Sequence, residues 1–153
     1  MANVAQVCNN LHCLFLTVGE KLIVTPTYYV FEMMKEHQDA NGLKVDITTD
    51  RVGVDKKTKI PRVSVSASEK DGKTLITLVN TSYDEECEVC IELKGKEFDG
   101  EIGTALLTGA PNDYNDVDIN KVVPQNGSLK AEGAFVTVKL PAASVTSLYF
   151  NAK

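Results

Sequence analysis

The stretch VSVSASEKDGKTLITLVN, residues 63–80, decides the expected fold class. Over residues 63–67 apolar side chains alternate with serines, and this period of two is typical of a strand with one buried face. Residues 75–79 form a denser apolar run, as in a central strand. Asp71-Gly72 between the two segments is a strong signal for a two-residue hairpin turn. The stretch therefore predicts two antiparallel strands joined by a tight turn.

The same alternation continues through the rest of the chain. Further strands are expected at residues 43–48, 87–93, 102–107, 117–123, 134–140 and 145–150. Asn126-Gly127 supplies a second turn signal. About eight strands at regular spacing, without an intervening helix, indicate an antiparallel sandwich or barrel. We therefore expect residues 41–153 to form a mainly β domain, a jelly-roll-like antiparallel β-sandwich.

Residues 1–40 follow a different pattern. The apolar residues that recur there at helical spacing are Val4, Val7, Cys8, Leu11, Leu14 and Phe15. No residue from Met1 to Gly19 is charged, so this helix is expected to be buried on more than one side. A short strand at 22–25 and a second helix at 27–37 should follow, with Asn41-Gly42 as the stop signal.

A helix, a strand and a helix cannot close a parallel sheet by themselves, because such a sheet needs several βα units. Residues 1–40 are therefore either the end of a larger α/β domain or a helical cap on the sandwich. The pattern alone leaves both readings open.

Composition excludes several classes of function. The chain has 153 residues, 43% of them hydrophobic, and a net charge of -5, which suits one domain with a short appendage. A chain that repels phosphate is a poor nucleic-acid partner. No apolar run approaches the roughly 18 residues of a membrane span, and the N-terminus lacks the basic region of a secretory signal. We expect no membrane or nucleic-acid partner and a cytoplasmic protein, although a signal upstream of Met1 stays open.

Cysteine and acidic clusters do not indicate a metal or a cofactor. Cys87 and Cys90 have the spacing of half a zinc site, but on a strand residues three apart point to opposite faces. Together with Cys8 and Cys13 they are expected to be ordinary thiols. The acidic stretch 112–118 lacks the glycine and the closing glutamate of an EF-hand calcium loop, so a polar loop is favoured over a calcium site.

The sequence also shows no set of residues with which this chain alone could catalyse a reaction. The two histidines, His12 and His37, have no nucleophile motif beside them, and we interpret them as a packed residue and a helix-end residue. The glutamates in the helical part are Glu20, Glu32 and Glu36, and none ends a strand as barrel chemistry requires. Tyr83 and Tyr114 are the best candidates for stacking a sugar, although packing roles are favoured for both. We predict no catalytic residue.

Two sets of motifs carry a family resemblance. The first contains Met-Ala-Asn-Val-Ala-Gln at 1–6 and Thr-Pro-Thr-Tyr-Tyr-Val-Phe at 25–31, followed by His-Gln-Asp-Ala at 37–40. The second contains Asn-Asp-Tyr-Asn at 112–115, Val-Val-Pro at 122–124 and Leu-Pro-Ala-Ala-Ser-Val at 140–145. Together they span essentially the whole chain, which resembles the C-terminal region of the α-L-arabinofuranosidases of glycoside hydrolase family 51.

The resemblance implies a specific division of the chain. In the family a (β/α)8 barrel carries the chemistry, and a β-sandwich packs beside it. Residues 1–40 would be the last part of that barrel, namely its seventh helix, eighth strand and eighth helix, and residues 41–153 would be the sandwich. The resemblance also implies that Gln6 lies near the bound sugar; from the pattern, an amide that caps the first helical turn is an equal alternative.

The resemblance further implies a non-catalytic role for this chain. The family's acid/base and nucleophile glutamates lie upstream of the matched region, so the parent protein would be the retaining hydrolase that removes terminal arabinofuranose from arabinan and arabinoxylan. The expected partners are the missing catalytic barrel, further copies in a homo-oligomer and, through the parent enzyme, arabinose-containing polysaccharide. The alternative is a stand-alone β-sandwich module that binds carbohydrate or protein.

Overall fold

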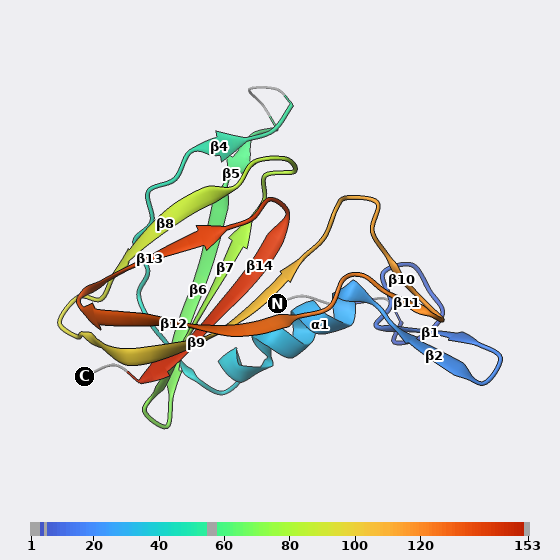
Figure 1. Cartoon of the computed structure of the whole chain (residues 1–153), viewed down its shortest axis with the longest axis horizontal. Helices are drawn as coiled ribbons and strands as arrows, with labels where there is room; N and C mark the ends of the chain where they lie inside the picture. The colour runs from blue at the N-terminus through green and yellow to red at the C-terminus, as the bar shows by residue number, and fades with distance from the viewer. Residues whose placement is uncertain (1–3, 5, 55–57, 152–153) are drawn as a thin grey trace.

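The computed structural model describes residues 4, 6–54 and 58–151, and its main body is a β-sandwich (Figure 1). One layer is an antiparallel sheet of six strands in the order β12-β9-β14-β7-β6-β3. Its strands are β3 (Asn41–Gly42), β6 (Val63–Lys70), β7 (Lys73–Asn80), β9 (Phe98–Thr108), β12 (Gln125–Gly133) and β14 (Ser144–Asn151). The facing layer pairs only β13 (Phe135–Leu140) with β8 (Cys87–Glu92). The predicted mainly β, antiparallel fold is confirmed.

The hairpin predicted at residues 63–80 forms as expected. Lys70 of β6 faces Lys73 of β7, which leaves Asp71 and Gly72 as the two turn residues. Both have positive φ angles, 52° and 78°, and this left-handed conformation is the one that Asp-Gly turns adopt between twisted strands.

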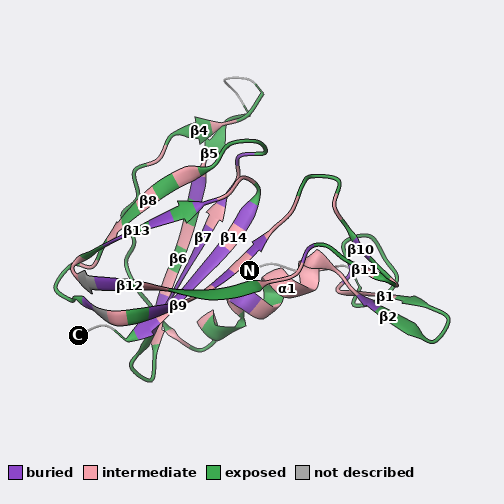
Figure 2. Cartoon of the chain, viewed as in Figure 1, coloured by how far each residue is buried: buried purple, intermediate pink, exposed green. Residues whose placement is uncertain are grey.

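The core fills the space between the two layers (Figure 2). Leu78, Ile102, Leu140 and Leu148 are at most 1% exposed, and the rings of Phe98 and Phe150 lie 4.9 Å apart. Burying one such side chain stabilises a fold by roughly 1.5–3 kcal/mol. These apolar residues therefore hold the layers together.

The two-stranded layer leaves part of this core open. Val65 and Ala67 of β6 point toward β8 but are only half-buried, and a cleft of about 1050 Å³ separates them from residues 43–50. The other edge of β8 carries no ladder partner, and its glutamates, Glu88 and Glu92, are exposed.

Four of the six remaining strand predictions hold, and two are wrong. The strands expected at 87–93, 102–107, 134–140 and 145–150 are β8, β9, β13 and β14. The strand expected at 43–48 is wrong, because the ladder ends at Gly42 and only the amide of Leu43 still bonds to Ala67 O. The alternating residues there lack a neighbour to pair with.

The region around 117–127 was also assigned wrongly. In place of one strand at 117–123 there is a short hairpin of β10 (Asn115–Asp116) and β11 (Ile119–Asn120). Asn126-Gly127 is not a turn but lies within β12, opposite Ala105 and Thr104. A Cβ on Gly127 would lie 3.2 Å from Thr104 Oγ1, so the absence of a side chain here relieves a tight contact between β12 and β9.

The first predicted helix is wrong as well. Over residues 6–14 the chain is irregular, and it continues into a hairpin of β1 (Phe15–Val18) and β2 (Lys21–Val24). Asn9 and His12 have φ angles of 53° and 57°, which no α-helix tolerates. The Asn9 side chain instead bonds to the amide and hydroxyl of Thr17, and Val7 O accepts two amides. These local bonds and the β-branched residues outweigh the helical spacing. The first helix, which was expected from the apolar residues between Val4 and Phe15, is not present in the described part of that segment.

The short strand and the second helix predicted in the N-terminal part are present, although β2 is largely exposed and pairs antiparallel with β1. The short strand at 22–25 is β2, and the helix at 27–37 is α1 (Pro26–Met34) followed by a turn of 3₁₀-helix, η1 (Lys35–His37). Proline at the first helical position fits its fixed φ angle. The helix ends before the predicted stop, because Asp39 takes a left-handed conformation and Asn41-Gly42 is already β3. Among the described residues, no helix is long and apolar enough to cross a bilayer.

Candidate functional site

An arm projects from one end of the sandwich and is built from the hairpins β1–β2 and β10–β11 (Figure 1). Asn115 joins the two hairpins, and only 7% of this residue is exposed. Its Nδ2 donates to Val24 O at 3.1 Å and to Val122 O at 2.8 Å, and its Oδ1 accepts the amide of Val122 at 2.9 Å. Asn115 therefore satisfies three backbone groups and fixes the arm to the sandwich.

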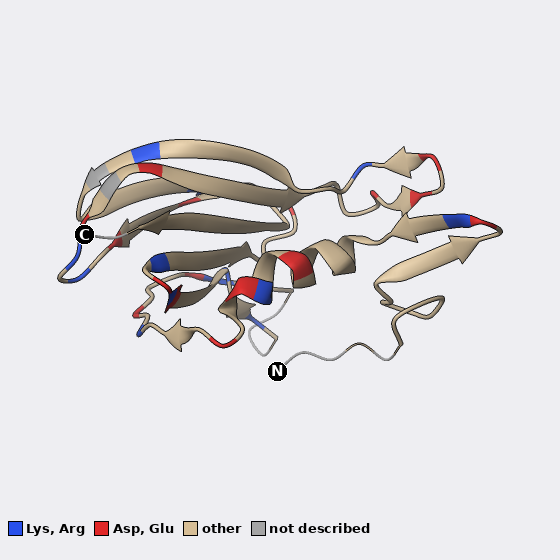
Figure 3. Cartoon of the chain, turned by 90° about the horizontal axis from the view of Figure 1, so that it is seen from below, with Lys and Arg blue, Asp and Glu red and all other residues tan. Residues whose placement is uncertain are grey.

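Helix α1 connects the arm with the outer face of the large sheet (Figure 3). Met33 packs with Ala105, Leu107 and Val122 in a second, smaller apolar cluster. Toward the arm, the rings of Tyr28 and Phe15 lie 5.1 Å apart. The helix is thus held at both ends by apolar contacts.

His37 fastens the end of the helical segment to the sheet. Its Nδ1 lies 2.7 Å from Ser68 Oγ, and its Nε2 lies 3.0 Å from Thr77 Oγ1. Burial lowers the pKa of His37 below its usual value of 6.5. Both ring nitrogens are engaged by hydroxyl groups and no carboxylate orients the ring, so the arrangement is not a catalytic triad. The predicted helix-end role is confirmed, whereas His12 is not packed but exposed in a turn.

The acids of the N-terminal part do not form a catalytic pair. Glu32 bonds to Lys35 Nζ at 2.6 Å and accepts the hydroxyl of Tyr28 at 3.0 Å. The bond from Lys35 is the main reason why the pKa of Glu32 is lowered, and Tyr28 adds to it. A glycosidase acid needs a raised pKa, so Glu32 is unsuited to that role. Glu20 and Glu36 are exposed.

The acidic loop 112–118 forms the polar turns that its sequence predicted. Asp113 accepts the amide of Ala110 at 2.9 Å and pairs with Lys121 at 3.1 Å, and the Ala110 amide followed by Lys121 lowers the pKa of Asp113. Asp116 accepts the next amide along the chain, whereas Asp118 pairs with Lys21 on the other hairpin. The carboxylates of this loop are therefore engaged separately, and no cluster of metal-ligating residues occurs within the described ranges.

The cysteines follow the strand geometry that was expected. Cys87 is half-buried against the core, Cys90 is exposed, and both are free thiols, as are Cys8 and Cys13. Burial is the main reason why the pKa of Cys87 is raised. A thiol of this kind is unreactive, because only the thiolate is a strong nucleophile.

The sugar-contact candidates lie apart in the chain. Gln6 is exposed in the irregular segment before β1, so it cannot cap a helical turn; its contact with a sugar stays a prediction. Tyr83 follows β7 and is 69% exposed, whereas Tyr114 precedes β10 and is 54% exposed.

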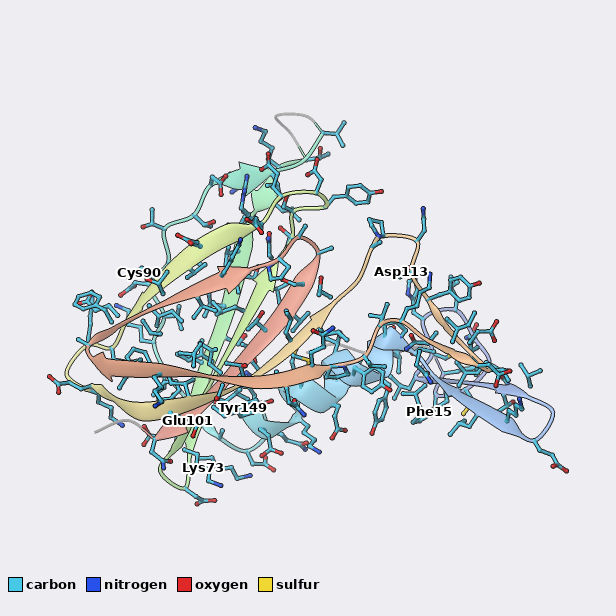
Figure 4. All side chains as sticks on the ribbon, in the orientation of Figure 1. Phe15, Lys73, Cys90, Glu101, Asp113 and Tyr149 are labelled. Atoms are coloured by element: carbon cyan, nitrogen blue, oxygen red, sulfur yellow. The ribbon has the colours of Figure 1, made fainter. Side chains whose placement is uncertain are left out.

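A feature that the sequence did not reveal is an open groove between α1 and the outer face of the large sheet. It has a volume of about 1020 Å³. Tyr29 and Met33 line it from the helix, and Tyr149, Glu101 and Lys73 line it from the sheet; Figure 4 shows the last three close together. Only the register of β9, β14 and β7 brings these residues together, so their spacing in the sequence gave no signal.

Comparison with known proteins identifies the domain. Residues 1–144 match the family model of the α-L-arabinofuranosidase C-terminal domain. The chain is 40% identical over 152 residues to an intracellular exo-α-L-arabinofuranosidase of Bacteroides ovatus, a match that covers 97% of this chain and 29% of that protein.

Solved structures agree with this assignment. A family 51 arabinofuranosidase of Xanthomonas axonopodis pv. citri superposes with a TM-score of 0.87 and 33% identity, over 98% of this chain and 31% of that one. An α-L-arabinofuranosidase of Thermotoga maritima shares the fold, with a TM-score of 0.82 and 20% identity, over 96% of this chain and 33% of its own. The chain thus spans about a third or less of the relatives that it matches. The resemblance predicted from the motifs is confirmed, and this chain belongs to the family of α-L-arabinofuranosidase C-terminal domains.

Proposed function

We propose that this chain is the non-catalytic, C-terminal part of an α-L-arabinofuranosidase and stabilises a catalytic domain carried by another part of the same protein. The parent protein would remove terminal arabinofuranosyl groups from arabinan or arabinoxylan, with the acid/base and nucleophile glutamates outside residues 1–153. The relatives in the comparison are longer chains named for this activity, which supports the proposal.

The observation that carries the proposal is the exposed apolar surface of the arm. In the β1–β2 hairpin, Leu22 shares a face with Thr17, whereas Val18 shares the opposite face with Lys21. Leu22 is 60% exposed and Val18 is 58% exposed, so each face of the hairpin presents an apolar side chain to solvent. A two-stranded hairpin is marginally stable alone, and one with apolar residues on both faces needs neighbours on both sides.

The segment before the hairpin extends this surface. Leu11 is 79% exposed and Val7 is 55% exposed, and both belong to the uncharged stretch that ends at Gly19. The catalytic domain is the partner that would cover them, because it would adjoin the arm directly in the chain. We further propose that residues 1–40 belong structurally to that domain, that residues 41–153 are the accessory sandwich, and that copies of the parent protein assemble into a homo-oligomer.

Gln6 is the residue that we propose to contact the sugar. It lies one residue before Val7, whose carbonyl accepts the amides of Leu14 and Phe15 and so holds this segment against the start of β1. In the parent protein, replacing Gln6 with alanine should raise KM for an arabinofuranoside more than it lowers the melting temperature. An unchanged KM would remove Gln6 from the site.

A chimaera tests the proposed role. Residues 1–153 would replace the matching part of the Bacteroides ovatus relative, and arabinose release from a chromogenic arabinofuranoside would be measured. We expect an active, folded chimaera, an inactive product when the matched part is deleted, and no arabinose release by the 153-residue chain alone. Activity of the isolated chain, or full activity after the deletion, would refute the proposal.

A matched pair of variants identifies the surface. Val18→Asp and Leu22→Asp should each lower the melting temperature and activity of the chimaera, because a charge would be buried against the catalytic domain without a partner. Tyr83→Asp, in an exposed loop between β7 and β8, should leave both unchanged. Equal effects of all three variants would mean that the arm is not the contact surface.

A further inference from the structure

We propose that the groove between α1 and the large sheet is a binding site for a neutral sugar residue of an oligosaccharide, laid against Tyr149. The choice of pentose oligosaccharides as probes and the role of the site beside a catalytic domain rest on the proposed function.

The floor of the groove is a row of outward-facing residues on neighbouring strands. Tyr149 of β14 stands directly opposite Leu75 of β7 on one side and Gly103 of β9 on the other. Directly opposed residues share a face of the sheet. Because Gly103 has no side chain, nothing from that position covers the half-buried ring of Tyr149. An aromatic ring beside a glycine forms a shallow hollow with an apolar face, which is the surface that the C–H face of a sugar ring contacts.

Polar groups surround this hollow from three elements. Glu101 lies on the same face of β9 as Gly103, and Asn126 lies on that face of β12, one row further along, where it stands opposite Ala105. Lys73 reaches the groove from the start of β7, and all three of these polar residues are exposed. Carboxylate, amide and ammonium groups together supply the acceptors and donors that sugar hydroxyls require.

The charge of the lining favours a neutral ligand. The acids are Glu32, Glu36, Asp71 and Glu101, and the bases are Lys35, Lys70 and Lys73. Because acids and bases alternate along the lining, its electrostatic potential favours neither an anion nor a cation. Figure 3 shows both signs of charge side by side along α1 and η1.

The lining also argues against a protein segment as the occupant. Among the described residues, none of the large apolar side chains that are exposed to solvent lines the groove. These side chains lie on the arm and in the segment before it, at Phe31 of α1, in residues 43–60, and at Tyr83, Tyr114 and Phe135. The centre of a protein interface is usually apolar and depleted of charge. A groove that combines several aromatic side chains with charged and amide groups is more typical of a carbohydrate site.

The groove is held open before any ligand binds. Its helical wall is anchored by Met33 in the apolar cluster with Ala105 and Leu107, and by the bonds of His37 to Ser68 and Thr77. A preformed site loses little conformational entropy on binding. The site would hold one branch of a polysaccharide while a catalytic domain acts on another, which raises the effective concentration of substrate.

The test is a titration of the 153-residue chain with arabino-oligosaccharides and xylo-oligosaccharides. Calorimetry would measure binding, and amide chemical shifts would locate it. We expect shifts that cluster at Glu101, Gly103 and Asn126. Gly103→Val fills the hollow without changing any polar group, and it should weaken binding about fivefold, since a lost aromatic contact is worth about 1 kcal/mol. A Cβ at this position would lie 3.7 Å from its nearest neighbour, Tyr149 O, so the strand tolerates it.

Controls distinguish the outcomes. Tyr114→Ala and Tyr83→Ala remove exposed tyrosines outside the groove and should leave binding unchanged. The proposal is overturned if neither oligosaccharide shifts the groove amides, if Tyr114→Ala or Tyr83→Ala abolishes binding, or if Gly103→Val leaves binding intact but destabilises the chimaera. The last result would identify the groove as a contact with the catalytic domain. None of these outcomes bears on whether the chimaera releases arabinose, so the proposed function is judged separately.

Discussion

Replacing Asn115 with alanine should release the arm from the sandwich while the sandwich itself stays folded. The substitution removes one acceptor and two donor hydrogen bonds, and it leaves the amide of Val122 and the carbonyls of Val24 and Val122 without their side-chain partner. A net contribution of about 1 kcal/mol for each bond gives about 3 kcal/mol, and access of water to the half-buried Val24 reduces this to about 2–3 kcal/mol.

The expected change is local, because the core that joins the two layers does not include the arm. Amide hydrogen exchange of the β1–β2 and β10–β11 hairpins should therefore accelerate about 30- to 150-fold, whereas exchange at Leu78 and Leu148 should not change. Asn115→Asp should be worse than alanine, because a carboxylate would face two carbonyl oxygens. Asn120→Ala is the matched control, since Asn120 is the exposed partner of Asn115 in the hairpin. Wild-type exchange in the arm of Asn115→Ala would show that Asn115 does not hold it.

Three further outcomes test other parts of the structure. Burial lowers the pKa of His37, so the unfolded chain binds a proton at higher pH than the folded chain does. The stability that neutral His37 contributes should be full above pH 6.5, about the unfolded pKa, and should be lost as the pH falls through the folded pKa. His37→Gln should remove this part of the pH dependence of the melting temperature. Leu148→Ala, at a position with 0% exposure, should lower the free energy of unfolding in urea by about 2–5 kcal/mol, and a loss below about 1 kcal/mol would contradict the assigned core. The isolated chain should self-associate through the arm, and Val18→Asp with Leu22→Asp should make it monomeric in sedimentation experiments; a wild-type monomer at high concentration would count against this.

The sequence was most informative where local chemistry and burial agree. Over residues 63–80 the alternation, the dense central run and the Asp-Gly turn all indicate one hairpin, and the structure has it. The opening segment was misread because Val7, Leu11 and Leu14 satisfy helical spacing, whereas the backbone follows the side-chain bonds of Asn9 and the left-handed residue His12. The spacing of apolar residues indicates which face of a helix could be buried. It does not show whether side-chain hydrogen bonds such as those of Asn9 stabilise a different backbone conformation.

The turn predicted at Asn126-Gly127 was wrong for a related reason. The dipeptide favours a turn in isolation, but here it pairs with Ala105 and Thr104 along the ladder between β12 and β9. The groove could not be predicted at all, because Tyr149, Glu101 and Lys73 meet only through the register of three strands that are distant in sequence. The family motifs were informative about ancestry, yet they carry no information about that register.

The unpaired edge of β8 sets a limit on how copies of this domain can meet. Its exposed face carries Glu88 and Glu92, so two β8 strands aligned antiparallel would bring glutamates opposite glutamates. That repulsion discourages the growth of fibril-like ladders from an edge that otherwise offers free amides and carbonyls. Concentrated salt screens this repulsion, and under that condition this strand is where we expect aggregation to begin.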